Sequence, residues 1–387
     1  MRLFSRIEKG KINFDIDRKE LRGVLSEIHL ADIHFGAIDP KDEYDILKRE
    51  VINELHRIPI IDIIFINGDL FERKYTTDSE PVRYASLFMQ DIRQVAISKK
   101  ATVVLLSGTE SHDAGQLNLF YHYLEDPEFD IRIIENIRFE YIKGARILCI
   151  PELYGVPEDI YQKFLFESGI YDQCVMHGTI EGAIYGNTVN KRGRLFGIDD
   201  FGNCRGPIIS GHVHVAGCFN SHFYYTGSPI RYKFGEEQEK GFLLVYYNLD
   251  SCDYYAHLIP VKSFRYDTIN IDELISQDPR DIINYINDLK EKEGIDYLRV
   301  CFTREIPSEN LAIIREYYRN NGKIQLKQET DKSDDMINSV QTKDFAEFDY
   351  LFDDNLSPYD KLAIYINKQE QCEYITGDEI KKILEED

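Results

Sequence analysis

Aspartate and histidine side chains recur in five short polar blocks, each directly after an apolar stretch. The blocks contain Asp32 and His34; Asp69; His112 and Asp113; His177; and His212 and His214. In Asp-x-His and His-x-His, alternate residues of an extended chain point to one side, so both side chains can reach one site. Carboxylate and imidazole ligands suit manganese, iron or zinc better than magnesium, and a carboxylate can bridge two ions roughly 3.5–4 Å apart. The blocks therefore predict a pair of divalent cations that activates water and stabilises charge on a phosphoryl group.

Each block also has a plainer interpretation when it is taken alone. His34 or His177 alone is typical of a hydrogen-bonded core histidine, and Gly68-Asp69 alone is typical of a turn. The ordered set, in which every member follows an apolar run, favours the two-metal site because such motifs gain meaning from their structural context.

The elements that must position these blocks are short runs rich in β-branched residues. The predicted strands cover residues 24–31, 60–67, 101–107, 146–150, 174–177, 207–210 and 241–248. Residues 42–55 and 81–98 have the length and periodicity of helices. This alternation predicts a layered α/β domain, and open α/β sheets place their sites at the carboxyl ends of strands.

A smaller α+β unit is predicted from about residue 261 onward. It has helical patterns at 281–293 and 308–320 and strand patterns at 297–303 and 323–328. Two short helix signatures with capping-box spacing begin at Ser357 and Thr376, beyond a polar linker. Each is too short to be stable alone, so it either binds a partner or packs back on the parent domain.

Composition limits the classes of protein that remain. With 387 residues, two or three domains are expected. A net charge of −22 excludes a protein that coats nucleic acid by bulk attraction, so any DNA contact must be local. The seven cysteines form no Cys-x-x-Cys pair, which argues against a zinc knuckle or a disulfide framework. Neither a membrane span nor a signal peptide is indicated, so a cytoplasmic location is expected.

The five blocks resemble, in the same order, those of the calcineurin-like metallophosphoesterases. They read Asp32-Ile33-His34-Phe35-Gly36, Gly68-Asp69-Leu70-Phe71, Ser111-His112-Asp113, Met176-His177-Gly178 and Gly211-His212-Val213-His214. Leu70-Phe71 and the segment 225–231, followed by Phe234, Glu236, Lys240 and Gly241, are similar to SbcD-type DNA repair nucleases. The resemblance implies an α/β fold: a layered αββα metallophosphoesterase sandwich with a small α+β capping domain and a C-terminal helical tail.

The resemblance also implies a role for each residue of the site. Asp32, His34 and His214 would hold one ion, His177 and His212 the other, and Asp69 would bridge the two; manganese is the expected metal. His112 matches the catalytic histidine, which stabilises or protonates the leaving oxygen, and Asp113 would orient it.

One block departs from the family pattern. The family has Gly-Asn-His-Asp, whereas this chain has Gly108-Thr109-Glu110-Ser111-His112-Asp113, with two extra residues and no asparagine. Of Thr109, Glu110 and Ser111, the carboxylate of Glu110 is the strongest ligand for a hard cation. Glu110 is therefore the chemically better substitute for the asparagine, although the sequence leaves the choice among the three open. We expect weaker occupancy or altered metal choice at the second position.

The family likeness predicts five segments along the chain. They are an N-terminal extension (1–22), the nuclease domain (23–260), a capping and DNA-contact domain (261–330), a linker (331–344) and a helical segment (345–387) that binds an SbcC-like SMC-type ATPase. A homodimer is also implied. The basic islands 190–194 and 231–233, with Tyr224 and Tyr225 as stacking groups, are the expected DNA contacts; solvated loops and core aromatics are their plainer interpretation.

The predicted function is that of a metal-dependent DNA exonuclease or endonuclease that hydrolyses phosphodiester bonds in repair, recombination or end processing. Two alternatives remain open. The altered block at residues 108–113 also fits a nuclease-impaired scaffold for the ATPase, and the same metal pair serves phosphatases and cyclic-nucleotide phosphodiesterases.

Overall fold

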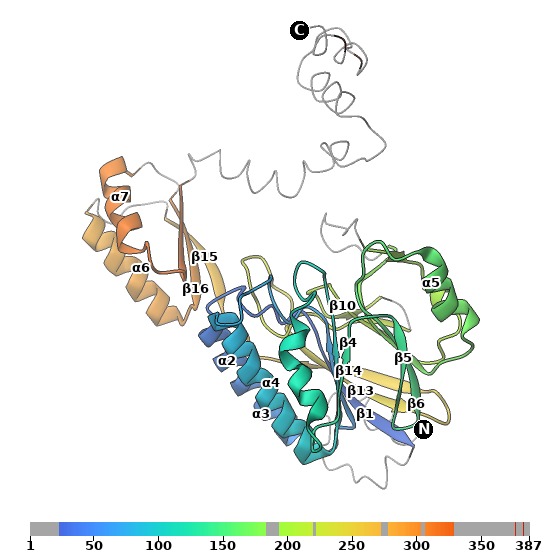
Figure 1. Ribbon diagram of the computed structural model, residues 1–387. Helices are drawn as coiled ribbons and strands as arrows, with labels where there is room; N and C mark the ends of the chain where they lie inside the picture. Colours follow the sequence, from blue (N-terminus) through green and yellow to red (C-terminus); the bar gives the residue numbers. More distant parts are fainter. Residues whose placement is uncertain are drawn as a thin grey trace.

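The computed structural model describes residues 23–182, 193–219, 222–271, 278–302 and 306–328, together with 376 and 382 (Figure 1). The expected N-terminal extension and linker, and the C-terminal helical segment apart from residues 376 and 382, lie outside these described residues.

The first of two large sheets has six strands in the order β14-β13-β1-β2-β3-β4. Their bounds are Tyr254–Pro260, Gly241–Asn248, Val24–Leu30, Ile63–Asn67, Thr102–Leu106 and Ile131–Ile134, respectively. Strands β1 to β4 run parallel, and β13 pairs antiparallel with both β1 and β14. Every residue of β1, β2 and β3 is buried, as expected for parallel strands covered on both faces.

The second large sheet also has six strands, in the order β11-β12-β10-β7-β6-β5. Their bounds are Gly217–Cys218, Phe223–Tyr225, Ile208–Gly211, Gln173–His177, Ala145–Ile150 and Arg138–Ile142, respectively. Strands β6, β7, β10 and β12 are parallel, and the antiparallel strands β5 and β11 form the edges. A short parallel pair, β8 (Thr179–Ile180) and β9 (Leu195–Phe196), lies apart from this sheet.

Helices cover the outer face of each sheet (Figure 1). The first sheet shares an apolar cluster with α2 (Pro40–Leu47), α3 (Asn53–Arg57) and α4 (Glu80–Lys99). The π-helical turn η1 (Lys48–Ile52) joins α2 to α3. The 3-10 helix η2 (Leu117–Glu125) also packs against this sheet. The second sheet shares another cluster with α5 (Glu158–Gln162), η3 (Lys163–Glu167) and η4 (Ile198–Phe201).

A third apolar cluster joins the two sheets face to face. It combines Leu25 and Phe65 of the first sheet with Ile147 and Val175 of the second. The layers therefore run helix, sheet, sheet, helix, which confirms a mixed α/β architecture with two sheets arranged as a sandwich. Because β1, β2 and β3 are parallel, and β6, β7 and β10 are parallel, the loops that follow these strands collect at one edge of each sheet.

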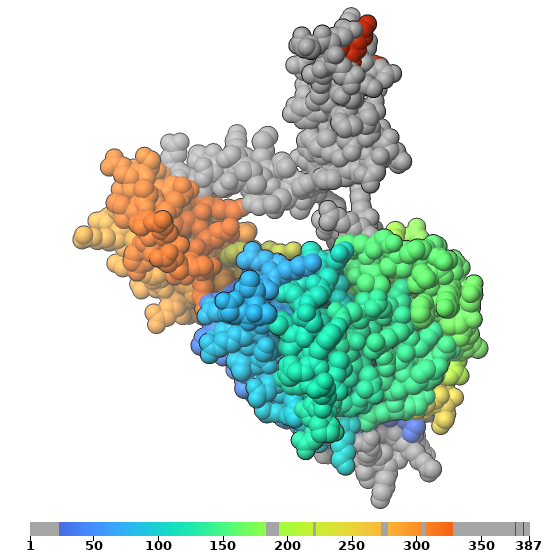
Figure 2. Space-filling view, in the orientation of Figure 1, coloured from blue at the N-terminus to red at the C-terminus, as the bar shows by residue number. Residues whose placement is uncertain are grey.

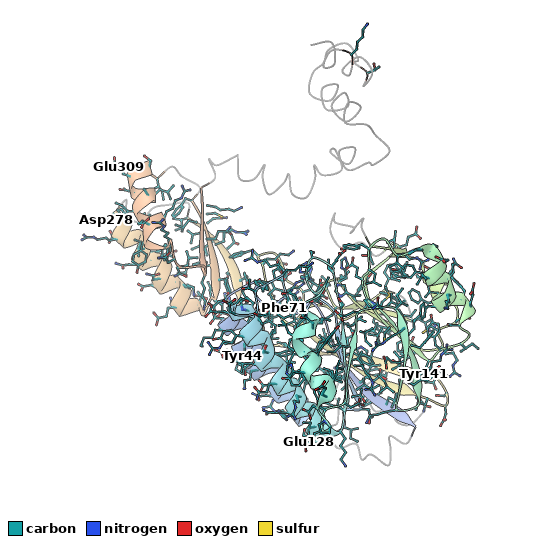
Figure 3. All side chains as sticks on the ribbon, in the orientation of Figure 1. Tyr44, Phe71, Glu128, Tyr141, Asp278 and Glu309 are labelled. Carbon is teal, nitrogen blue, oxygen red and sulfur yellow. The ribbon has the colours of Figure 1, made fainter. Side chains whose placement is uncertain are left out.

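A small three-stranded sheet follows the sandwich, with its own apolar cluster. Its parallel strands are β15 (Tyr266–Ile271), β16 (Tyr297–Phe302) and β17 (Ile324–Gln328), and its helices are α6 (Pro279–Glu293) and α7 (Ser308–Tyr317). Asp278, labelled in Figure 3, caps α6 through a hydrogen bond from the Arg280 amide. The ring of Tyr297 in β16 packs against that of Phe264, which precedes β15. Figure 2 shows the small unit in orange beside the blue N-terminal segments. None of the described helices is long and apolar enough to cross a membrane.

Candidate metal centre

Four of the predicted ligands adopt strained backbone conformations at the strand ends. Seven described non-glycine residues have positive φ, and the four are Asp32 (51°), His34 (53°), Asp69 (52°) and His212 (83°). Such conformations cost about 1–3 kcal/mol each and concentrate at functional sites. The strain is held by the neighbouring loop, because the Asp32 amide donates to Gly68 O at 3.1 Å and the His34 amide donates to Asp69 O at 3.0 Å.

The first cluster of ligand atoms belongs to Asp32, His34 and His214. These atoms all lie within 4.8 Å of one another. His34 Nε2 and His214 Nε2 face each other at 3.0 Å, and Asp32 Oδ2 is buried without a hydrogen-bond partner. Two imidazole nitrogens and an unpartnered carboxylate oxygen that converge in this way form a donor set suited to a divalent cation.

The second cluster contains Asp69, His177 and His212, again within 4.8 Å of one another. His177 Nδ1 lies 2.7 Å from Asn67 O, so Nε2 is the nitrogen that faces the cluster, 3.2 Å from Asp69 Oδ2. The same Asp69 oxygen lies 3.8 Å from His34 Nε2 in the first cluster. Asp69 Oδ2 therefore occupies the position between the clusters that a bridging carboxylate requires.

Glycine makes this close approach possible at two of the strand ends. A Cβ on Gly68, which has a φ of +87°, would lie 2.3 Å from His177 Nδ1. A Cβ on Gly108 would lie 2.2 Å from Asp69 Oδ1. Any larger residue at either position would displace a predicted ligand.

Carboxylates lie beside the outer nitrogens of two of the histidine rings. Glu72 Oε2 lies 3.1 Å from His34 Nδ1, and Glu236 Oε1 lies 3.6 Å from His214 Nδ1, which leaves each Nε2 for the cluster. Buried Lys240 pairs with Glu236 at 3.3 Å. Burial would raise the pKa of Glu236, but His214, Lys240 and the Tyr232 amide lower it to about 2. Sequence reasoning noted Glu236 and Lys240 only as part of a family segment and did not single out Glu72.

The electrostatics of the second cluster indicate that it needs positive charge. Burial would lower the pKa of His177, but Asp69, Asp32 and Glu152 raise it to about 10. Burial would likewise raise the pKa of Asp69, but His177, His34 and His112 hold it below its usual range. A proton on His177 thus balances the neighbouring buried carboxylates, and divalent cations would supply the same balance when they displace that proton.

His112 and Asp113 are placed differently from the expected pair. The imidazole Nδ1 of His112 lies 3.1 Å from Phe71 O, while the Asp113 carboxylate accepts hydrogen bonds from the amides of Leu70, Phe71 and Gly108 at 2.9–3.3 Å. The expectation that Asp113 orients the imidazole directly is therefore wrong. Asp113 acts one step away, because it accepts a hydrogen bond from the amide of Phe71, the residue whose carbonyl positions His112; Figure 3 labels Phe71.

The expectation that Glu110 replaces the missing asparagine is also wrong. Glu110 and Ser111 are exposed, whereas Thr109 is buried against Asp69. The Thr109 amide donates to Asp69 Oδ1 at 2.6 Å, and its hydroxyl lies 3.1 Å from Asp69 Oδ2 and 2.9 Å from Glu152 Oε2. The carboxylate that lies beside Thr109 and the second cluster belongs to Glu152, a residue that the sequence analysis did not identify.

Three of the residues expected to contact DNA, Tyr225, Arg194 and Arg231, have structural roles instead. Tyr225 is fully buried, and its hydroxyl accepts a hydrogen bond from the Ile180 amide, so its ring offers no face for stacking. Arg194 pairs with Glu158 at 2.8 Å and Asp200 at 3.2 Å. The Arg231 guanidinium donates to Glu236 O at 2.7 Å. Tyr224 is half-buried, and residues 190–192 lie outside the described part of the chain.

A cleft of about 1070 Å³ lies between the small unit and the sandwich. It is lined by residues from both, among them Tyr232, Lys233, Arg299, Asn321 and Lys323. The ring centroid of Tyr232 is 5.9 Å from that of His34, so the cleft begins beside the first cluster. Sequence reasoning placed Lys233 in a basic island but missed the cations of the small unit, because only the fold brings β16 and β17 to this cleft.

Comparison with known proteins yields little for this chain. No family model matches the sequence, and no curated protein matches it. Solved structures do match, and one of these crystal structures aligns with 61% of this chain and 99% of its own chain, at 12% sequence identity and a TM-score of 0.36. A TM-score this low does not establish a shared fold.

Proposed function

We propose that this protein is a metal-dependent phosphodiesterase that holds two divalent cations, with manganese as the expected metal and DNA as the substrate. The observation that carries the proposal is the position of Asp69 Oδ2, 3.2 Å from His177 Nε2 and 3.8 Å from His34 Nε2, between two His/Asp clusters. Paired cations that share a carboxylate are typical of enzymes that displace groups at phosphorus.

Each residue of the site has a proposed role. Asp32, His34 and His214 would hold one cation and His177 and His212 the other, with Asp69 shared between them. When bound, such a pair lowers the pKa of a water molecule and neutralises charge that develops on the phosphoryl oxygens. His112 is half-buried beside His34, and its Nδ1 is held by Phe71 O, so its Nε2 is the atom that would protonate the leaving oxygen.

The cleft supports a polyanionic substrate. Lys233 and Arg299 line it in a chain whose net charge is −22, beside Lys323, which pairs with Asp42. Tyr232 connects the cleft to the first cluster. Local cations are what an acidic protein needs to contact a phosphate backbone. The scaffold alternative loses support, because Thr109 of the altered block contacts Asp69 and Glu152, and the ligand atoms of both clusters remain together.

The substrate proposal predicts that Lys233→Gln weakens DNA cleavage selectively. Lys233 is exposed in the cleft and is not a predicted metal ligand. We expect KM for linear DNA to rise, and the salt dependence of DNA binding to fall by about one unit of slope, because one phosphate contact is lost. Hydrolysis of bis(p-nitrophenyl) phosphate with Mn²⁺ should not change.

The matched control is Lys292→Gln, an exposed lysine on α6 that does not line the cleft. Cleavage of nucleotides or phosphomonoesters in preference to DNA would favour a phosphatase or cyclic-nucleotide phosphodiesterase and contradict the DNA proposal. An SbcC-like ATPase partner and a homodimer are part of the proposal; the segment 345–387, proposed to bind the ATPase, lies outside the described residues apart from 376 and 382.

A further inference from the structure

We infer that Glu152 is a direct ligand of the second cation and replaces the neutral amide ligand that the residue 108–113 block lacks. The inference rests on the proposed two-metal function and specifies one of its ligands. Glu152 lies two residues after β6, which pairs in parallel with β7, the strand that ends at His177. The carboxylate thus reaches the same edge of the second sheet as two of the predicted ligands.

The carboxylate points into the second cluster. Glu152 Oε2 lies 3.2 Å from His212 Nδ1 and 3.8 Å from His177 Nε2. His177 Nε2 is itself buried and lacks a hydrogen bond, although it faces both Glu152 and Asp69. A nitrogen that is removed from water and left without such a bond between two carboxylates is placed as a metal ligand would be.

Two neighbours hold the carboxylate in this position. The Thr109 hydroxyl lies 2.9 Å from Glu152 Oε2 and 3.1 Å from Asp69 Oδ2, so it ties the two carboxylates together. On the other side, a Cβ on Gly193 would lie 2.7 Å from Glu152 Oε1, so glycine leaves the room that the second oxygen needs. A purely structural glutamate would not need to lie between two predicted metal ligands.

A glutamate ligand in place of the asparagine of the family pattern changes the charge of the site. A carboxylate in place of an amide adds one negative charge beside Asp69, and anionic oxygen binds a hard cation more strongly than a neutral oxygen does. The second position should therefore bind Mn²⁺ tightly, in contrast to the weaker occupancy that the missing asparagine suggested.

The test compares Mn²⁺ binding by Glu152→Ala, Glu152→Gln and the parent protein, by equilibrium dialysis with electron paramagnetic resonance of free and bound ion. In Glu152→Ala we expect one of the two dissociation constants, that of the second position, to rise at least about 10- to 100-fold, since even residues that only support ligands have effects of this size. The constant of the first position should stay unchanged, and the signal of spin-coupled Mn²⁺ pairs should disappear at Mn²⁺ concentrations that saturate the parent. Glu152→Gln keeps the shape but loses the charge, so an intermediate rise is expected.

The matched control is Glu110→Ala, because Glu110 is the exposed carboxylate of the same altered block. It should bind two Mn²⁺ ions with parental constants. Unchanged constants in both Glu152 variants, with the parent's circular dichroism spectrum retained, would overturn the inference; if only Glu152→Ala misfolds, the Gln variant decides. If the parent binds two ions and the Glu152 variants bind them equally well, only the role of Glu152 as a ligand is refuted. If the parent binds no ion, the proposed function itself is refuted.

Discussion

Asp69→Asn is expected to lower kcat/KM for bis(p-nitrophenyl) phosphate on the order of 10⁴-fold, the scale observed when a central member of a catalytic group is removed. Asp69 Oδ2 faces both clusters, at 3.2 Å from His177 Nε2 and 3.8 Å from His34 Nε2. The asparagine keeps the volume but removes the charge that the two cations would share. Hydrolysis should be measured over a range of Mn²⁺ concentrations, and excess Mn²⁺ should not restore it.

A suitable control for Asp69→Asn is Asp78→Asn, because Asp78 is exposed on the loop before α4. It should retain parental activity. If Asp69→Asn kept even a tenth of the parental kcat/KM while correctly folded, the shared carboxylate would not be essential, and the bridging role would have to be abandoned.

His112→Gln is expected to reduce kcat for DNA by about 10²- to 10⁴-fold without changing Mn²⁺ stoichiometry, which is the range for loss of a general acid. His112 Nδ1 is held by Phe71 O, so Nε2 is available to the leaving oxygen. The loss should be much smaller with bis(p-nitrophenyl) phosphate, because p-nitrophenolate leaves readily without a proton. The comparison of the two substrates separates proton donation from a general disturbance of the site.

His122→Gln provides the corresponding control, since His122 is an exposed histidine on η2. It should behave as the parent does with both substrates. Equal losses of His112→Gln on DNA and on the activated diester would argue against general acid catalysis, and loss of bound Mn²⁺ would instead make His112 a metal ligand.

The six predicted ligands could be recognised in the sequence because their placement follows from a simple rule. Asp32, Asp69 and the histidines follow apolar strands, and the carboxyl ends of neighbouring parallel strands meet at one edge. Glu152 obeys the same rule, since it follows the predicted strand at 146–150, but no family block marks it. A search for every polar residue just beyond a predicted strand would have found it.

The errors arose where side-chain direction depends on tertiary contacts. Glu110 has the better chemistry for a ligand, but the Thr109 amide bonds Asp69 and the next residues of the loop are exposed. Tyr225 lies on β12, a strand absent from the prediction, and the alternation of that strand directs its ring into the core. The sequence also does not show which carboxylates lie beside the predicted ligands, because Glu72 contacts His34 only once both loops have folded.

The central claim is that two divalent cations bind between the strand ends of the two sheets. The most direct measurement is the number of Mn²⁺ ions per chain after saturation and removal of excess metal, determined by elemental analysis of the purified protein. The account predicts two ions per chain in the parent protein. A folded parent protein without stoichiometric transition metal, or with a single ion, would contradict the account.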